Sequence, residues 1–144
     1  MGIIDRLRRW LLAPPEPDES LPRRHKVGRR GERVAVVHLK RRGYTILERN
    51  FRASGGEIDV VAFRDGTVVF VEVRSVTGPA RFDPRRTVGR RKQARIVHAA
   101  RQYASLHDVG REDVVLRFDV ITIIFQPPDG NPELRHVEGA FEAD

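Results

Sequence analysis

Four charged residues near the middle of the chain have types that suit the binding of a divalent metal ion. Three of them are carboxylates and the fourth is a cation: Glu57, Asp59, Glu72 and Arg74. Carboxylate oxygens are ligands that Mg²⁺ prefers, and a metal ion held by them can activate water against a phosphodiester. A nearby cation can stabilise the charge that develops in such a reaction. These residues are therefore candidates for a metal-dependent centre, provided that the fold brings them together.

A predicted tight turn lies between Asp59 and Glu72 in the sequence. It would fold the strand that carries Glu57 and Asp59 back onto the strand that carries Glu72 and Arg74. Asp65-Gly66 lies between β-branched and aromatic runs and predicts a type I′ turn, because that turn needs positive φ at both central positions. Counting outward from a two-residue loop places Asp59 opposite Glu72 and Glu57 opposite Arg74. Side chains alternate along a strand, so all four lie on one face of the predicted hairpin.

The predicted pairing of Asp59 with Glu72 is unfavourable by itself. Like charges directly opposite each other destabilise a pair of strands by about 0.2 to 1 kcal/mol. A fold that places these carboxylates together therefore needs a compensating cation. Arg74 and a divalent metal ion are the two candidates.

Helical and strand patterns alternate around this hairpin. The predicted elements are a helix over 29–42, a strand over 44–51, the hairpin over 56–74, a helix over 90–107 and a strand over 114–125. Gly43 is a suitable left-handed cap for the first helix. Residues 131–144 form a predicted tail whose apolar side chains pack back on the sheet. This order predicts an α/β fold with a mixed central sheet flanked by helices.

Two further acids lie inside the predicted elements. Glu32 is near the start of the first helix, where a carboxylate interacts favourably with the helix macrodipole. Asp119 is the lone acid of the last predicted strand. It is either a metal ligand or a hydrogen-bonded structural residue, and we favour the structural role.

Basic residues follow the hairpin almost without acids. Between Arg81 and Arg101, Asp83 is the only acidic residue. The cations that we expect to contact phosphate are Arg52, Arg81, Arg85, Arg86, Arg91, Lys92 and Arg95. Cations on a helix ordinarily form a solvated face, but the near lack of acids favours contact with nucleic acid.

The composition agrees with a polyanionic partner. The 144 residues have a formal charge of +7, with 27 Lys and Arg, of which only three are Lys, against 20 Asp and Glu. The planar fork of arginine matches phosphate. A well-solvated protein from an arginine-rich proteome would have the same composition, so composition alone does not decide between the two. The lack of Cys excludes disulfides, thiolate metal sites and a Cys nucleophile.

The chain divides into an N-terminal extension over 1–24 and one domain over 25–144. Residues 1–12 have apolar residues at helical spacing, which predicts a short helix that either lies on a membrane surface or docks on the domain; we favour docking. Residues 13–24 form a proline-rich linker. No run approaches 18 apolar residues and no signal peptide is evident, so we expect no membrane span and a cytoplasmic protein.

Short motifs over roughly residues 27–141 resemble a known family in their order and spacing. They are Gly31-Glu32 with Ala35, Leu39 and Gly43, Arg49-Asn50-Phe51-Arg52, Gly56-Glu57-Ile58-Asp59, Phe70-Val71-Glu72-Val73-Arg74, Lys92, and Arg117-Phe118-Asp119-Val120. The chain in this respect resembles the bacterial YraN family (UPF0102), which is related to Holliday-junction resolvases and belongs to the restriction-endonuclease-like nuclease superfamily.

The resemblance implies a restriction-endonuclease-like core and assigns roles to four residues. Asp59 and Glu72 would bind Mg²⁺ or Mn²⁺, and Glu32 would reach the same site from its helix. Arg74 would occupy the position of the superfamily's catalytic Lys. Arginine stays protonated and cannot act as a base, although it can stabilise charge in the transition state.

Two functions therefore remain open. One is a metal-dependent endonuclease that acts on structured or branched DNA, which the carboxylates favour. The other is a non-catalytic nucleic-acid-binding module that retains the nuclease fold, which Arg74 favours. The partner in both cases is nucleic acid, with DNA expected, and a homodimer is compatible with either.

Overall fold

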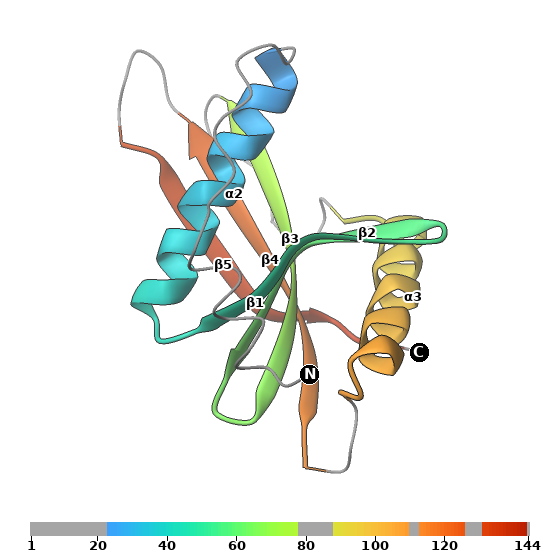
Figure 1. The fold of residues 1–144 in the computed structure, drawn as a ribbon. Helices are drawn as coiled ribbons and strands as arrows, with labels where there is room; N and C mark the ends of the chain where they lie inside the picture. The colour runs from blue at the N-terminus through green and yellow to red at the C-terminus, as the bar shows by residue number, and fades with distance from the viewer. Residues whose placement is uncertain (1–22, 78–87, 110–112, 126–130, 144) are drawn as a thin grey trace.

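The computed structural model describes residues 23–77, 88–109, 113–125 and 131–143, with only the backbone for 23–27 and 77 (Figure 1). Its elements in chain order are α2 (Arg23–Arg41), β1 (Thr45–Ala53), β2 (Gly56–Arg64), β3 (Thr67–Thr77), α3 (Arg90–Leu106), β4 (Val115–Phe125) and β5 (Glu133–Phe141). The predicted α/β class is confirmed. The predictions for residues 1–22 and for Arg81, Arg85 and Arg86 lie outside the described residues.

The five strands form one mixed sheet in the order β1-β2-β3-β4-β5. Neighbouring strands are antiparallel except β3 and β4, which run parallel from Thr67↔Val115 to Thr77↔Phe125. Parallel strands need a crossover connection, and α3 lies in that connection. The strands β1 and β5 form the two edges of the sheet.

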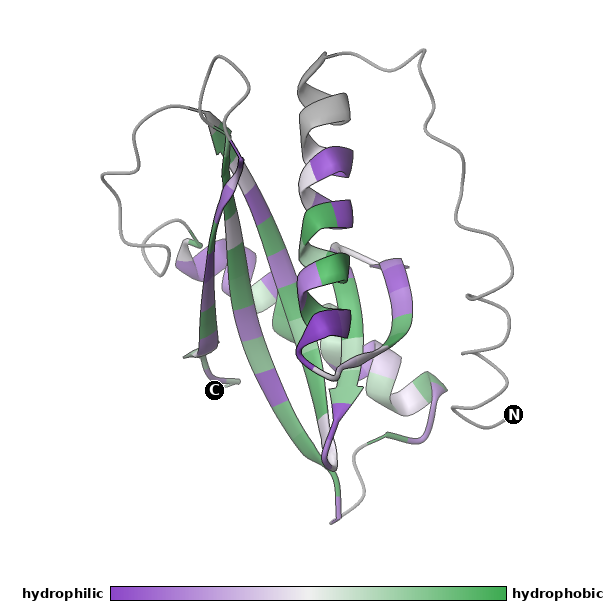
Figure 2. Cartoon of the chain, turned by 90° about the vertical axis from the view of Figure 1, so that its left-hand side faces the viewer, coloured by the Kyte–Doolittle hydropathy of each residue, from purple (hydrophilic) through white to green (hydrophobic). Residues whose placement is uncertain are grey.

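One helix packs on each face of the sheet. The side chains of Val69 and Val71 in β3 pack in the core under α2, whereas Val68 and Phe70 pack in the core under α3. Apolar residues therefore face both cores, which explains the nearly unbroken apolar run of this strand. Figure 2 shows α2 lying over one face of the sheet, with polar and apolar residues interleaved along the strands. Neither helix is long and apolar enough to cross a membrane.

The predicted turn and the predicted helix cap are both confirmed. Asp65 and Gly66 have φ values of 49° and 75°, as a type I′ turn requires. Gly43, two residues after Arg41 at the end of α2, has a φ of 85°, in the left-handed region that glycine adopts without steric cost.

Two predicted boundaries were wrong. The helix predicted over 29–42 begins at Arg23, because residues 23–28 contain no proline that would interrupt it. The predicted tail contains β5, which pairs with β4 through partners such as Val137 and Val120. Its half-exposed, largely polar sequence is typical of an edge strand and lacks the apolar signal of the inner strands.

The hairpin of β2 and β3 opens at its base. Its ladder runs from Arg64↔Thr67 to Val60↔Val71; beyond that pair β2 continues only with β1 and β3 only with β4. We call the opening beyond Val60 and Val71 the fork. The predicted strand pairings of Asp59 with Glu72 and of Glu57 with Arg74 are therefore both wrong, because the ladder ends before them.

The reason for the fork is a close contact between β2 and α3. A Cβ at Gly56 would lie 2.4 Å from the backbone oxygen of Arg95, so glycine lets the start of β2 lie directly on the helix. Figure 1 shows β2 leaving the hairpin and extending over α3. The two strands consequently separate where their acidic residues lie.

Candidate functional site

Asp59 and Glu72 are the first residues of the fork, one on each strand. Their relative exposures are only 8% and 4%. The Val73 N–H donates a hydrogen bond of 2.8 Å to Oδ2 of Asp59. The side chain of Asp59 therefore links β2 to β3 beyond the end of the backbone ladder. The fold thus brings together the two carboxylates that were predicted to be neighbours.

The environment of Asp59 disfavours its negative charge. Burial raises the pKa of Asp59 well above its ordinary value, and the negative charges of Glu72 and Glu32 raise it further. The hydrogen bond from the Val73 N–H lowers the pKa but does not outweigh these effects. The fork is therefore short of positive charge on the side of Asp59.

The cation that compensates Glu72 comes from α3. Lys92 Nζ lies 2.5 Å from Glu72 Oε1. We expected Arg74 or a metal ion in this role, and we expected Lys92 to contact phosphate. The sequence contained a signal for the observed position, because Lys92 precedes the buried residues Ile96 and Tyr103 by four and eleven positions, on the same stripe of the helix.

Arg74 follows Glu72 on β3 and is half-buried. Among the described side chains, no carboxylate lies within ion-pair distance of its guanidinium. The two cations of the site thus have different positions. Lys92 contacts the carboxylate of Glu72, whereas Arg74 lies two residues after Glu72 on β3.

Glu32 approaches the fork from α2. Its side chain is 17% exposed and lies 3.8 Å from Arg49 of β1. Burial raises the pKa of Glu32, although a hydrogen bond with Asn50 and the charge of Arg49 oppose this. Because Glu32 also raises the pKa of Asp59, the two carboxylates lie close enough to interact. The sequence did not indicate that Arg49 and Asn50 would support this residue.

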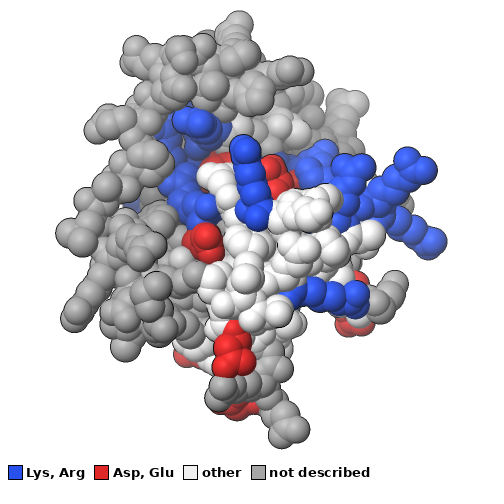
Figure 3. Space-filling view, turned by 45° about the vertical axis from the view of Figure 1, so that its right-hand side comes forward, with Lys and Arg blue, Asp and Glu red and all other residues white. Residues whose placement is uncertain are grey.

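The predicted phosphate contacts lie in several environments. Arg91 and Arg95 are exposed on α3, so their role as phosphate contacts stays a prediction. Arg52 is exposed at the end of β1 and lies 3.9 Å from Glu57. Figure 3 shows basic side chains gathered around acidic ones on the side of the molecule that carries α3.

The donor set at the fork fits a divalent cation in its chemistry. Asp59 and Glu72 offer hard oxygen ligands in a buried place with unbalanced negative charge. Within the ranges that the structure describes, no three His, Asp or Glu side chains form a ready-made group that could hold a metal ion. The site therefore offers two neighbouring carboxylates rather than a closed cage.

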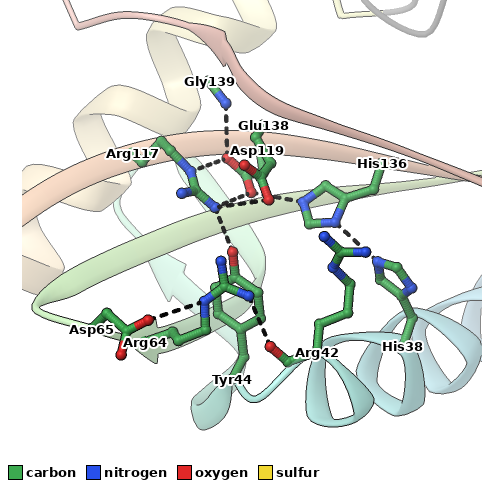
Figure 4. A network of polar contacts seen from close by, with 10 residues as sticks. All are labelled: His38, Arg42, Tyr44, Arg64, Asp65, Arg117, Asp119, His136, Glu138 and Gly139. Atoms are coloured by element: carbon green, nitrogen blue, oxygen red, sulfur yellow. Dashed lines mark hydrogen bonds and ion pairs between the residues drawn. The ribbon is translucent and has the colours of Figure 1, made fainter.

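Asp119 has the structural role that we favoured. Both of its oxygens accept hydrogen bonds: Oδ1 from Arg117 Nε and Gly139 N, and Oδ2 from Arg117 and from His136 Nε2 at 2.7 Å. Burial alone would raise the pKa of Asp119, but these hydrogen bonds together lower it below its ordinary value. Figure 4 shows this network linking β4, β5 and α2.

A mixed five-stranded sheet with a helix on each face and an acidic fork is compatible with the α/β core of nucleases. Residues 31–123 match the model of "Uncharacterised protein family UPF0102". The chain belongs to this family.

Curated relatives of the chain carry the same family name. A UPF0102 protein of Anaeromyxobacter dehalogenans is 45% identical over 122 residues, covering 84% of this chain and 87% of that protein. A UPF0102 protein of Geobacter metallireducens is also 45% identical, over 81% of this chain and 92% of that protein. A UPF0102 protein of Alkaliphilus oremlandii is 40% identical, over 81% and 97%.

Proposed function

We propose that this protein is a metal-dependent endonuclease that acts on structured or branched DNA. The observation that carries the proposal is the pair of buried, mutually repelling carboxylates of Asp59 and Glu72 at the fork. Acids are rarely buried without a paired cation, and of the described cations only Lys92 pairs with this site, through Glu72. A perturbed acid such as Asp59 is characteristic of functional sites. The family resemblance noted above favours the same reaction class.

Asp59 and Glu72 would hold Mg²⁺ or Mn²⁺ at this site. Such an ion, when bound, supplies Lewis acidity and lowers the pKa of coordinated water. Glu32, whose negative charge raises the pKa of Asp59, would act on the same site from α2. Lys92 and Arg74 would stabilise the negative charge that develops on the phosphodiester.

The DNA would approach the fork along α3. Arg91 and Arg95 are exposed on the same helix that carries Lys92 to the carboxylates. Phosphates bound by these cations would place the DNA backbone next to the fork. The net charge of +7 would add attraction of longer range.

A non-catalytic nucleic-acid-binding module is the second candidate. One observation favours it: the ammonium group of Lys92 already neutralises Glu72, so the pair is compatible with a purely structural fork. The presence of Arg74 in place of lysine points the same way, because arginine cannot act as a base. Such a protein would bind DNA and leave it intact.

A cleavage assay separates these functions. Linear, nicked and four-way DNA would each be incubated with the protein and Mg²⁺ or Mn²⁺, with a chelator as the blank. We expect metal-dependent cleavage, with the four-way substrate cut best, and its loss in Asp59→Asn. Glu57→Gln is the matched control, since Glu57 lies on the same strand but is exposed and paired with Arg52. Binding of all substrates without cleavage would support the module instead.

A further inference from the structure

A groove lies between α2 and the edge strand β5, apart from the fork. Its volume is about 460 Å³. The residues that line it are Arg30, Arg33, Val34, Val37, His38 and Arg41 of α2 and Leu134 of β5. At 3.6 residues per turn, Glu32 lies on the opposite side of α2 from this stripe, so the groove is separate from the acidic site.

The groove combines cations along its length with an apolar floor. Arg30, Arg33 and Arg41 are exposed, and none of them lies within ion-pair distance of a carboxylate in the part of the chain that the structure describes. Other arginines nearby are partnered: Arg135 lies 3.1 Å from Glu133, and Arg49 lies 3.8 Å from Glu32. The groove is thus lined by positive charge that the surrounding described residues do not neutralise.

An aromatic ring in the wall is held in place by the buried network. His38 Nε2 lies 3.0 Å from His136 Nδ1, and His136 Nε2 lies 2.7 Å from the carboxylate of Asp119 (Figure 4). Which ring donates depends on the tautomers of the two histidines, and in either case this hydrogen bond holds His38 against His136. Burial first, then the charges of His136 and Arg42, lower the pKa of His38, which favours its neutral imidazole.

We propose that this groove binds a short single-stranded segment of nucleic acid. The first and last arginines, Arg30 and Arg41, are eleven residues apart, which at 1.5 Å per residue is about 16 Å, or roughly three to five nucleotides of one strand. Phosphates would contact these cations, while base faces would cover Val34, Val37 and Leu134 and stack near the ring of His38.

The apolar floor is the reason for preferring a single strand to a duplex. In a duplex the base faces are stacked on one another. A duplex bound in the groove would therefore offer phosphates to the arginines but leave the apolar floor uncovered. In a single strand each base has a free face that apolar and aromatic side chains can cover. This inference rests on the proposed function only in taking nucleic acid as the partner.

The test is a binding titration of the full chain in chelator, which keeps it independent of cleavage. The probes are a fluorescent oligothymidylate of about five nucleotides, a blunt duplex and thymidine monophosphate. We expect the double variant Arg33→Ala with Arg41→Ala to lose about tenfold in affinity for the oligothymidylate and much less for the duplex. The charge-matched control, Arg90→Ala with Arg101→Ala, should retain binding of the oligothymidylate.

Each other outcome overturns the proposal. An equal loss for duplex and single strand would make the groove a general cationic surface. Unchanged binding of the oligothymidylate by the groove variant would place the single strand elsewhere. Binding of the monophosphate as tightly as the oligothymidylate would contradict a site that spans several nucleotides. The titration is done in chelator, so its result does not depend on whether the protein cleaves DNA. A protein that shows no cleavage could still give the binding result expected here.

Discussion

The charge of Asp59 is the least favourable feature of the fork at the scale of single residues. Its pKa is raised by burial first and then by Glu72 and Glu32, so the folded protein holds this proton more tightly than the unfolded chain does. The resulting contribution to stability is fully present below the unfolded pKa of about 3.9 and is lost as the pH rises through the folded value. Asp59 therefore destabilises the metal-free protein at neutral pH.

Replacing Asp59 by asparagine should remove this pH dependence. We expect the melting temperature of Asp59→Asn, measured in chelator, to rise relative to wild type as the pH increases from about 4 to 8. At the upper end the variant should be more stable by a few tenths of a kcal/mol up to about 1 kcal/mol, the range for like charges across strands. If the melting temperatures of the two proteins changed in parallel over this pH range, folding would not raise the pKa of Asp59.

Lys92 should have opposite effects on the protein with and without metal. Lys92→Ala leaves Glu72 buried without its cation, so we expect a loss of about 1 to 2 kcal/mol in chelator. The same change removes the ammonium that competes with a metal ion for Glu72. Added Mg²⁺ or Mn²⁺ should therefore stabilise Lys92→Ala more than wild type.

Arg91→Ala is the matched control for that comparison, since it removes a neighbouring exposed cation from the same helix. Its melting temperature should stay near that of wild type under both conditions. Thermal melts of the three proteins decide the point. A metal-induced shift that is smaller in Lys92→Ala than in wild type would mean that Lys92 supports metal binding rather than competing with it.

At the scale of elements, the hairpin could be predicted from local sequence patterns. The fork could not, because it is formed by contacts between distant segments. Asp65-Gly66 set the turn and the register, and both were correct up to Val60↔Val71. The separation beyond that pair depends on the contact between Gly56 and α3, which joins segments far apart in the sequence. A pattern of neighbouring residues has no information about such a contact.

Gly56→Ala should therefore destabilise the protein. Its Cβ would lie 2.4 Å from a backbone oxygen of Arg95, and backbone in a helix moves only at a cost, so we expect a loss of about 1 to 3 kcal/mol. Gly28→Ala is the control: this helical glycine has open space around it, and alanine should stabilise α2 by up to about 1 kcal/mol. Chemical denaturation would contradict the account if both variants were equally stable.

The polar network of β4, β5 and α2 was only partly predictable. Asp119 stood out as a lone acid in an apolar strand, which indicates a hydrogen-bonded role. Its partner His136 lies in a segment that we expected to be a tail, and His38 lies on a helix 98 residues away from His136. The sequence thus identified one member of the network and could not identify the two histidines.

At the scale of the whole molecule, basic residues lie on both sides of the sheet. Arg91 and Arg95 are on α3, whereas Arg30, Arg33 and Arg41 are on α2, which covers the other face. A nucleic acid that contacts both helices would have to bend around the edge of the sheet or be branched. If the proposed nuclease function holds, this arrangement would favour branched DNA over a straight duplex as the substrate.

Duplex binding should depend on salt through α3. Each phosphate contact adds about 0.9 to the slope of log K against log salt, so Arg91→Ala with Arg95→Ala should flatten the slope by up to about two. The variant Arg33→Ala with Arg41→Ala is the control and should leave the duplex slope nearly unchanged. An unchanged slope in the α3 variant would show that its arginines are merely solvated.

The metal-induced rise in melting temperature tests the central claim, that the fork binds a divalent ion. A ligand that binds only the folded state stabilises it by about 2.7 kcal/mol at a hundredfold excess over Kd. Wild type and Glu57→Gln would be melted with chelator and with excess Mg²⁺ or Mn²⁺, alongside Asp59→Asn. We predict a clear shift in the first two proteins and its loss in Asp59→Asn. An equal shift in all three would contradict the account and leave the fork carboxylates purely structural.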